Sequence, residues 1–114
     1  MGDGNRFVIY LYHGGNFRRI GGARFYSGGT YQRNEGFDLD RLRYFDVVGV
    51  VENLGYEKWN CIAYNIPKNG IVLFIDLEDD NDVITMVRNL SNECRCISMY
   101  VDGGLRKVTD TERG

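Results

Sequence analysis

The sequence predicts one α+β domain, in which a mixed β-sheet of four to five strands is covered by one main helix and one short helix. Two observations lead to this prediction. Segments in which apolar residues alternate lie on both sides of a single longer segment with helical period. In addition, 43% of the 114 residues are hydrophobic, which is enough for one modest core.

The N-terminal third is expected to form an antiparallel meander. Residues 6–13 alternate, so that Phe7, Ile9 and Leu11 share one face of a strand. Pairs of glycines follow, and we expect them to form turns or bulges, with the first hairpin turn at Gly14, Gly15 and Asn16. The segments between the glycine pairs are expected to be short strands: 17–20, 23–27 and 30–33.

The main helix is expected from Arg41 to Leu54. Asp38 is the predicted N-cap, and Gly55 supplies the C-terminal stop. The apolar residues at helical spacing are expected to face the sheet: Leu42, Phe45, Val48 and Val51, with Val47 and Leu54 beside them.

The second half of the chain alternates between strands and turns. Strands are expected over 59–66 and 71–75, separated by a turn that contains Pro67. A dense acidic loop follows, and Asp80 or Asn81 is the expected cap of a short helix. The short helix is expected to continue through Leu90, and a last strand is expected over 95–101. The domain then comprises residues 6–102, between flexible ends at 1–5 and 103–114.

The order is therefore two strands, a helix, two strands, a short helix and a strand. A hairpin, a crossing helix and a later strand are the ingredients of the β-grasp, or ubiquitin-like, roll.

Composition excludes several classes of protein. The net charge of −2 and the pI near 5.3 argue against a dedicated nucleic-acid binder. No apolar stretch approaches the length of a membrane span, and a signal peptide is not seen, so we expect a soluble intracellular protein. The three cysteines, Cys61, Cys94 and Cys96, are expected to be reduced and mostly buried rather than zinc ligands.

No arrangement of residues predicts catalysis or a cofactor. The lone histidine, His13, is expected to be an exposed residue at a strand end, and no nucleophile motif accompanies it. The glycines around Arg18 and Arg19 lack the ending of a phosphate-binding loop. The acidic loop begins with calcium-loop spacing but has Asn81 and Val87 where glycine and glutamate are needed, so no metal site is predicted.

Charge is distributed unevenly along the chain. Residues 1–34 carry five arginines against one aspartate, whereas residues 68–93 carry six acidic residues against one lysine and one arginine. If these segments lie on different faces, the basic face of one copy can meet the acidic face of the next. Such a contact is heterologous and builds chains or rings. The expected acidic face consists of Asp76, Glu78, Asp79, Asp80 and Asp82, and the expected basic face of Arg6, Arg18, Arg19 and Arg24.

Four segments give the chain a family resemblance: YLYHGGNF at 10–17, YSGG at 26–29, FDLDRLRYFDVVGVVENLGY at 37–56 and YVDGG at 100–104. Together they resemble the plant PB-one-like domain found near the N-terminus of Mutator-like transposase proteins. The resemblance implies the ubiquitin-like fold of Phox-and-Bem interaction domains, an acidic docking loop and a nuclear setting. The parent domains carry a lysine in the first strand, where this chain has Ile9, whereas Arg18 and Arg19 are similar to their following arginine pair.

The preferred prediction is a non-catalytic protein–protein interaction module that docks its acidic loop against an arginine-rich face, on itself or on another domain. One alternative is an accessory nucleic-acid-binding domain of a transposase-derived protein, with Arg18, Arg19 and Arg24 on phosphates and Tyr10 or Tyr12 stacking on bases. Another is a folded spacer without a defined partner. Cofactors, metals and membranes are not expected as partners.

Overall fold

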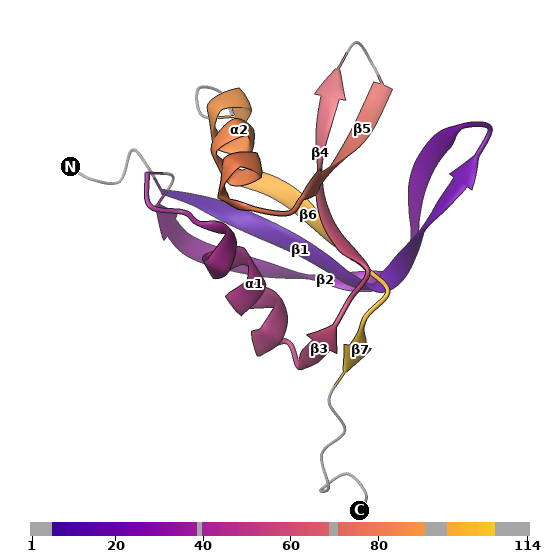
Figure 1. Ribbon diagram of the computed structural model, residues 1–114, viewed down its shortest axis with the longest axis horizontal. Helices are drawn as coiled ribbons and strands as arrows, with labels where there is room; N and C mark the ends of the chain where they lie inside the picture. The colour runs from indigo at the N-terminus through magenta and orange to yellow at the C-terminus, as the bar shows by residue number, and fades with distance from the viewer. Residues whose placement is uncertain (1–5, 39, 69–70, 91–95, 107–114) are drawn as a thin grey trace, which may run out of the picture.

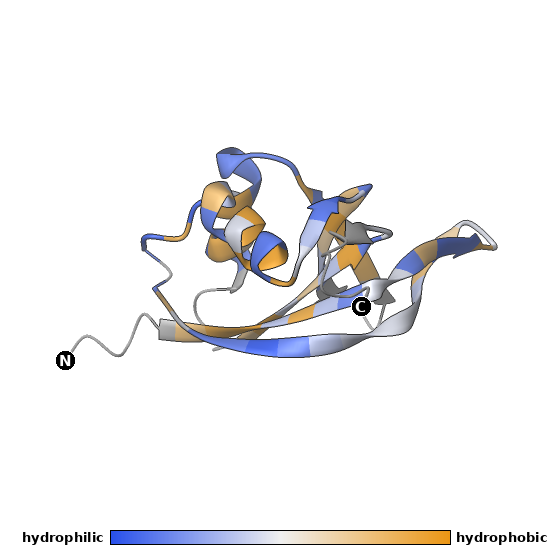
Figure 2. Cartoon of the chain, turned by 90° about the horizontal axis from the view of Figure 1, so that it is seen from below, coloured by the Kyte–Doolittle hydropathy of each residue, from blue (hydrophilic) through white to orange (hydrophobic). Residues whose placement is uncertain are grey.

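The computed structural model describes residues 6–38, 40–68, 71–90 and 96–106. Its five-stranded mixed sheet has the order β2-β1-β6-β4-β5, and two helices cover one face (Figure 1, Figure 2). The central strands β1 and β6 are parallel, and their other neighbours are antiparallel, which confirms the predicted α+β, β-grasp class. The elements are β1 (Arg6–Ile20), β2 (Ala23–Asp38), α1 (Tyr44–Asn53), β3 (Tyr56–Lys58), β4 (Cys61–Lys68), β5 (Ile71–Leu77), α2 (Asp80–Leu90), β6 (Cys96–Asp102) and β7 (Leu105–Arg106).

The core lies between the helices and one face of the sheet. Alternate residues of β1 and β6 point into it, because successive side chains of a strand lie on opposite faces. Leu11, Met99 and Val101 are completely buried there, and Val51 of α1 is buried against the same core. The strands contribute Phe7, Ile9, Ile62, Tyr64, Leu77 and Ile97, and α2 contributes Val83 and Met86.

The first hairpin is much longer than the sequence suggested. Its turn lies at Gly21 and Gly22, so the prediction of a turn at 14–16 is wrong. Strand β1 runs through that site, where Gly15 is paired with Gly28 of β2. A side chain at Gly29 would overlap the carbonyl oxygen of His13, so glycines here allow two backbones to approach closely rather than to reverse.

The main helix begins later than predicted. Asp38 ends β2 and closes a turn, in which its carbonyl oxygen accepts a hydrogen bond from the Arg41 N–H at 3.0 Å. Helix α1 then begins at Tyr44 and ends before Gly55, whose positive φ of 100° confirms the predicted stop. Leu42 is therefore buried just outside the helix.

Phe45 does not face the sheet as predicted, because 79% of it is exposed. Val47 and Val51 define the buried side of α1. Phe45 lies two residues before Val47, which is a rotation of about 200° around a helix of 3.6 residues per turn. The spacing of three residues counted from Leu42 was misleading because Leu42 lies before the helix.

The elements of the second half shift by one or two residues from their predicted positions. Strand β4 begins at Cys61 rather than at residue 59, and β5 continues through Asp76 to Leu77, so the acidic segment is partly strand. Helix α2 is capped by Asp79 instead of the predicted Asp80 or Asn81. Strand β6 begins one residue later than the predicted segment and extends through Asp102.

A two-stranded sheet of β3 and β7 was not predicted. Strand β7 falls within the segment 103–114 that was expected to form a tail, and the prediction for residues 1–5 lies outside the described residues. Among the helices of the described residues, none has the length and apolar character needed to cross a membrane.

Candidate functional site

Carboxylates gather at the N-terminus of α2, and the local hydrogen bonds fix their positions. The Asp79 carboxylate accepts a bond from the Asp82 N–H at 3.0 Å, and the Asp82 carboxylate accepts one from the Glu78 N–H at 2.7 Å. The Asp80 carboxylate accepts a bond from the Tyr44 N–H at 2.8 Å, at the start of α1. Negative charge at two helix N-termini is stabilised by both helix dipoles. We call Glu78, Asp79, Asp80 and Asp82 the acidic surface.

The acidic surface has an apolar neighbour. Tyr44, Phe45 and Val48 of α1 line a shallow hollow together with the exposed side chains of Glu78, Asp79 and Asp80. Burial, followed by the negative charges nearby, raises the pKa of Tyr44 above its ordinary value. No lysine or arginine of the described residues lies within ion-pair distance of the acidic surface.

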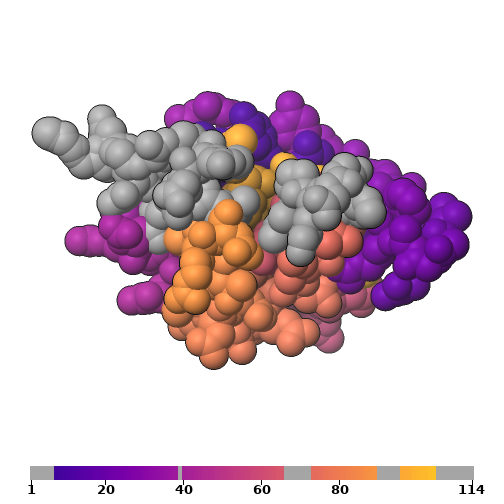
Figure 3. Space-filling model, turned by 90° about the horizontal axis from the view of Figure 1, so that it is seen from above, coloured from indigo at the N-terminus to yellow at the C-terminus, as the bar shows by residue number. Residues whose placement is uncertain are grey.

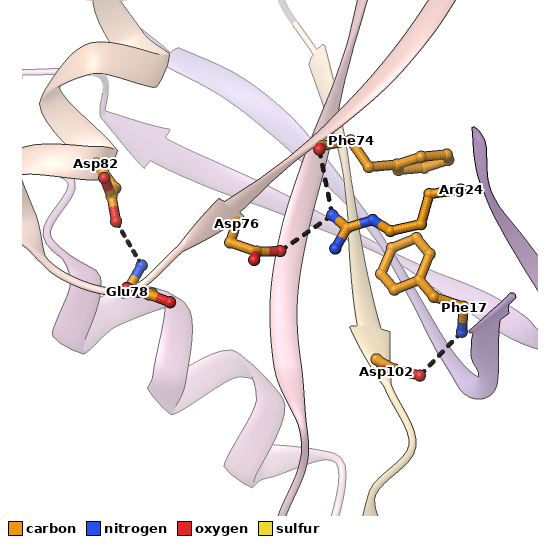
Figure 4. A network of polar contacts seen from close by, with 7 residues as sticks. All are labelled: Phe17, Arg24, Phe74, Asp76, Glu78, Asp82 and Asp102. Atoms are coloured by element: carbon orange, nitrogen blue, oxygen red, sulfur yellow. Dashed lines mark hydrogen bonds and ion pairs between the residues drawn. The ribbon is translucent and has the colours of Figure 1, made fainter. Parts of the chain in front are cut away.

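Two of the predicted site residues bind each other. Arg24 of β2 and Asp76 of β5 form an ion pair, with 3.0 Å between Nη2 and Oδ1 (Figure 4). The same nitrogen donates to the carbonyl oxygen of Phe74 at 3.1 Å, and the guanidinium carbon lies 4.4 Å from the centre of the Phe17 ring. Arg24 and Asp76 therefore hold the end of the first hairpin against β5, and neither is free to meet a partner.

The other predicted arginines lie at the end of the first hairpin. We call residues 18–25 the hairpin tip. Arg18 and Arg19 are exposed there, and no ion pair to a described carboxylate holds them. Two exposed apolar residues, Ile20 and Phe25, accompany them. The backbone of Arg6 pairs with Asp38, but its side chain lies outside what the structure describes.

The acidic surface and the hairpin tip are well separated. Figure 1 shows β4 and β5 standing between α2 on one side and the hairpin tip on the other. In Figure 3, the violet atoms of the tip lie at one end of the molecule and the orange atoms of α2 lie on the other side of β5. The two charged regions thus belong to different faces.

A family model for the PB1-like domain matches residues 3–103 of the chain. The chain belongs to the PB1-like family. No curated protein and no solved structure gives a match. PB1-like domains are protein-interaction modules and are generally non-catalytic, so this chain has the fold and the general function of such a module.

The first part of β1 carries no described positive side chain on its outward face. Ile9, which stands where the parent domains are expected to have lysine, is 1% exposed and belongs to the core. The outward residues of β1 on either side are Val8 and Tyr10, which carry no charge. The described and exposed arginines of β1 are Arg18 and Arg19.

His13 is not the exposed residue that the sequence suggested. It is 7% exposed, and its Nδ1 lies 2.9 Å from the hydroxyl oxygen of Tyr56. Because β1 continues through the glycine pair, His13 follows Phe7, Ile9 and Leu11 on the inward face. We assign it to the core.

The cysteines are less buried than predicted. Cys96 is exposed, Cys61 is half-buried, both are free, and Cys94 lies outside the described residues. Burial, together with the nearby Asp76 and Asp102 carboxylates, raises the pKa of the Cys61 thiol to about 11. In the described part of the chain, no group of three histidine, cysteine or acidic side chains could hold a metal ion.

Sequence reasoning missed two features of the outward sheet face. Asp102 accepts a hydrogen bond from the Phe17 N–H at 2.9 Å and so holds the base of the hairpin tip (Figure 4). Around it, aromatic residues of four strands form one cluster. The ring centres of Tyr12 and Tyr100 lie 4.7 Å apart and are stacked. The alternation that identified the inward residues also places Tyr10 and Tyr12 outward, but the cluster depends on strand order.

Proposed function

We propose that this PB1-like domain is a non-catalytic interaction module whose acidic surface docks against an arginine-bearing face. The main observation behind this proposal is that Glu78, Asp79 and Asp80 are exposed and face no described cation. Like charges this close are costly to hold together, and a cationic partner relieves the cost. The helix N-termini stabilise the carboxylates but leave them accessible.

The partner we favour is another copy of the same chain, which would contribute its hairpin tip. Arg18 and Arg19 are exposed there beside Ile20 and Phe25, and the acidic surface lies beside the exposed Phe45. The two faces therefore match in charge and in apolar character. Since they lie on different sides of the domain, the contact repeats head to tail and forms chains or rings.

The existing ion pair supports a smaller set of residues for the proposed contact. Of the acidic residues suggested by the sequence, Asp76 is engaged by Arg24, which leaves Glu78, Asp79, Asp80 and Asp82 for the partner. Of the basic residues, Arg18 and Arg19 are the described and exposed ones. An exposed ion pair contributes about 0–1 kcal/mol, so several pairs are needed for affinity in the micromolar range.

The alternative of nucleic-acid binding is less well supported. It needs Arg18, Arg19 and Arg24 on phosphates, but the Asp76 carboxylate already neutralises Arg24 at 3.0 Å. The acidic surface would also repel a phosphate backbone. The third alternative, a spacer, leaves the charge complementarity of the two faces without a role.

The family resemblance supports a further proposal about the setting. The segments at 10–17 and 37–56 resemble those of plant transposase-associated domains, so we propose that the domain works in a transposase-derived protein in the nucleus. Fluorescence microscopy of the full-length host protein tests this. Nuclear signal is the expected result, and exclusion from the nucleus contradicts it.

Molar mass in solution tests the self-association. We expect light scattering at low salt to give a mass that rises over a tenfold range of concentration. At about 1 M salt the screening length falls to about 3 Å, and the mass should return to that of one chain. A mass of one chain in every condition contradicts self-association and leaves a basic partner of another kind. A dimer that resists salt contradicts the electrostatic mechanism.

A further inference from the structure

A second surface, the aromatic cleft, lies far from the acidic surface. The end of the first hairpin, the adjoining part of β2 and outward residues of β1, β4, β5 and β6 line a space of about 890 Å³. Figure 1 shows the backbone of the hairpin tip curling up beside β5. Its lining is mainly aromatic, and the residues that matter below are Tyr12, Tyr26, Tyr31, Phe74 and Tyr100.

Fixed contacts hold the cleft open. At one end, Arg24 ties the tip to Phe74 and Asp76 of β5 (Figure 4). Deeper in, the Tyr26 hydroxyl donates to the Val101 carbonyl oxygen at 2.7 Å and accepts from the Gly15 N–H at 2.9 Å. These bonds join the hairpin to the centre of the sheet. The cleft is thus preformed, which lowers the entropic cost of binding.

Three tyrosine rings form a row along the cleft. Tyr31 and Tyr12 have ring centres 5.3 Å apart, and Tyr12 and Tyr100 have ring centres 4.7 Å apart. Tyr31 and Tyr100 are therefore separated by at most about 10 Å. One turn of a polyproline II helix has three residues and rises about 9 Å. A ligand with that repeat can place equivalent groups against the two ends of the row.

The free polar groups of the cleft include hydroxyl donors. The Tyr100 hydroxyl accepts from the Asn65 side chain at 3.1 Å and also interacts with the Ser98 side chain. Burial raises the pKa of Tyr100 above its ordinary value. The hydroxyls of Tyr12 and Tyr31 make no hydrogen bond with any described residue. The lining includes no carboxylate, and its one cation, Arg24, is neutralised by Asp76.

Charge and hydrogen bonding together select the class of ligand. A cleft with hydroxyl donors and no net charge is complementary to an uncharged ligand that presents acceptors. Peptides rich in proline fit this description, because proline has a carbonyl oxygen but no N–H. Their rings also pack on aromatic faces, and their extended helix is formed before binding. A nucleic acid is a poor match, since it needs several free cations for its phosphates.

We propose that the aromatic cleft between the hairpin tip and β5 binds a proline-rich peptide in the polyproline II conformation. The site would use the row of Tyr12, Tyr31 and Tyr100 for its aromatic contacts. It is independent of the acidic surface, so one domain carries two interaction sites on different sides of β4 and β5.

Fluorescence anisotropy with a fluorescein-labelled peptide of ten prolines tests the proposal on the full 114-residue chain. We expect saturable binding with a Kd on the order of 10–100 μM, as for other small aromatic grooves of this kind. The Tyr31→Ala variant removes an exposed ring and should weaken binding at least about fivefold. Tyr31→Phe keeps the ring and loses the hydroxyl donor, so its Kd should lie between the Kd of the unmodified protein and that of Tyr31→Ala.

Phe45→Ala is the matched control, because it removes an exposed ring from α1, outside the cleft, and should leave the Kd unchanged. Circular dichroism confirms that each variant is folded. Absence of saturable binding by the folded chain overturns the proposal, as does an equal loss in Phe45→Ala and Tyr31→Ala. A labelled oligothymidine of ten nucleotides that binds more tightly than the peptide, and depends on Tyr31, overturns it in favour of nucleic acid.

Discussion

Arg24 and Asp76 form an ion pair across 52 positions of sequence, with 3.0 Å between Nη2 and Oδ1. The side chains are only 20% and 42% exposed, and the same guanidinium stacks on Phe17. This one contact joins the basic N-terminal hairpin to the acidic half of the chain within a single molecule. The acidic surface and the exposed Arg18 and Arg19 remain unpaired among the described residues, on different sides of β4 and β5.

The Arg24→Ala variant should release the hairpin tip. It removes the ion pair, the hydrogen bond to the Phe74 carbonyl oxygen and the contact with the Phe17 ring. We expect the free energy of unfolding in urea to fall by about 1–2 kcal/mol and amide exchange in the tip to speed up. Arg19→Ala is the control and should change neither. If both variants retain the protection of the tip, the contact does not hold it.

Substitution of the paired glycines should distinguish a close approach of strands from a turn. In Gly29→Ala the new methyl group overlaps the His13 carbonyl oxygen, and the backbone φ at this position is +82°. We therefore expect the free energy of unfolding to fall by at least about 2 kcal/mol. Gly49→Ala, in α1 and facing open space, should stabilise by about 0.5–1 kcal/mol. Thermal unfolding of both variants checks this. A neutral Gly29→Ala would contradict the described pairing.

These glycines show which parts of the fold could be predicted from the sequence and which could not. Alternation along residues 6–13 identified the inward residues correctly, because it reports burial directly. A glycine pair, however, fits both a turn and a close approach of strands, and of the three pairs in the first hairpin only Gly21 and Gly22 reverse the chain. The prediction of Asp38 as a helix N-cap was wrong for a similar reason, because an aspartate caps an isolated turn as readily as a helix.

Candidate site residues were harder to predict than the fold. The acidic cluster was visible because five carboxylates lie within seven residues. That Asp76 would be taken by Arg24 depends on how far the hairpin curls toward β5, which no local pattern encodes. The aromatic cleft was missed for the same reason, because its row of Tyr31, Tyr12 and Tyr100 comes from three different strands.

Alkaline pH should destabilise the fold through Tyr26. Burial raises the pKa of its hydroxyl from 10.0 to about 12 in the folded state. The unfolded chain therefore releases this proton first, and stability falls as pH rises through 10 toward 12. Tyr26→Phe should lower the free energy of unfolding at pH 7 by about 1–2 kcal/mol, since two hydrogen bonds are lost.

The same variant should show a shallower decline of stability between pH 10 and 12. Urea unfolding at a series of pH values measures both effects. Tyr31→Phe, at an exposed position, is the control and should follow the unmodified protein. A decline in Tyr26→Phe as steep as in the unmodified protein would show that another group controls the alkaline limb.

Alkylation should separate the two described cysteines. The Cys61 thiol is half-buried and has its pKa raised to about 11, so little thiolate is present at pH 8. Cys96 is exposed and should react first with iodoacetamide. Peptide mass spectrometry over time measures the two rates. Faster labelling of Cys61 than of Cys96 would contradict the described burial.

Charge variants give the most direct test of head-to-tail docking, and the acidic side requires care. Asp79 and Asp80 also support helix starts, so asparagine keeps their acceptor oxygens while removing the charge. Glu78 makes no side-chain bond with the described residues and can be reversed. The acidic variant is therefore Glu78→Lys with Asp79→Asn and Asp80→Asn. Its control, Glu52→Lys with Glu57→Lys, makes the same change in net charge at exposed positions outside the acidic surface.

The basic variant is Arg18→Glu with Arg19→Glu, at two exposed positions of the hairpin tip. Its control is Arg41→Glu with Lys58→Glu, which makes the same charge change at exposed positions far from the tip in sequence. Circular dichroism should show that all four variants are folded. Each interaction variant retains one intact face, so neither can form a chain by itself.

The decisive measurement is the molar mass, by light scattering at low salt, of the acidic and basic variants alone and mixed in equal amounts. The proposed docking predicts one chain for each variant alone and a dimer for the mixture, because one intact acidic surface meets one intact hairpin tip. The two control variants should assemble like the unmodified protein. A mixture that stays at the mass of one chain, while the unmodified protein assembles, would contradict docking of the acidic surface on the hairpin tip.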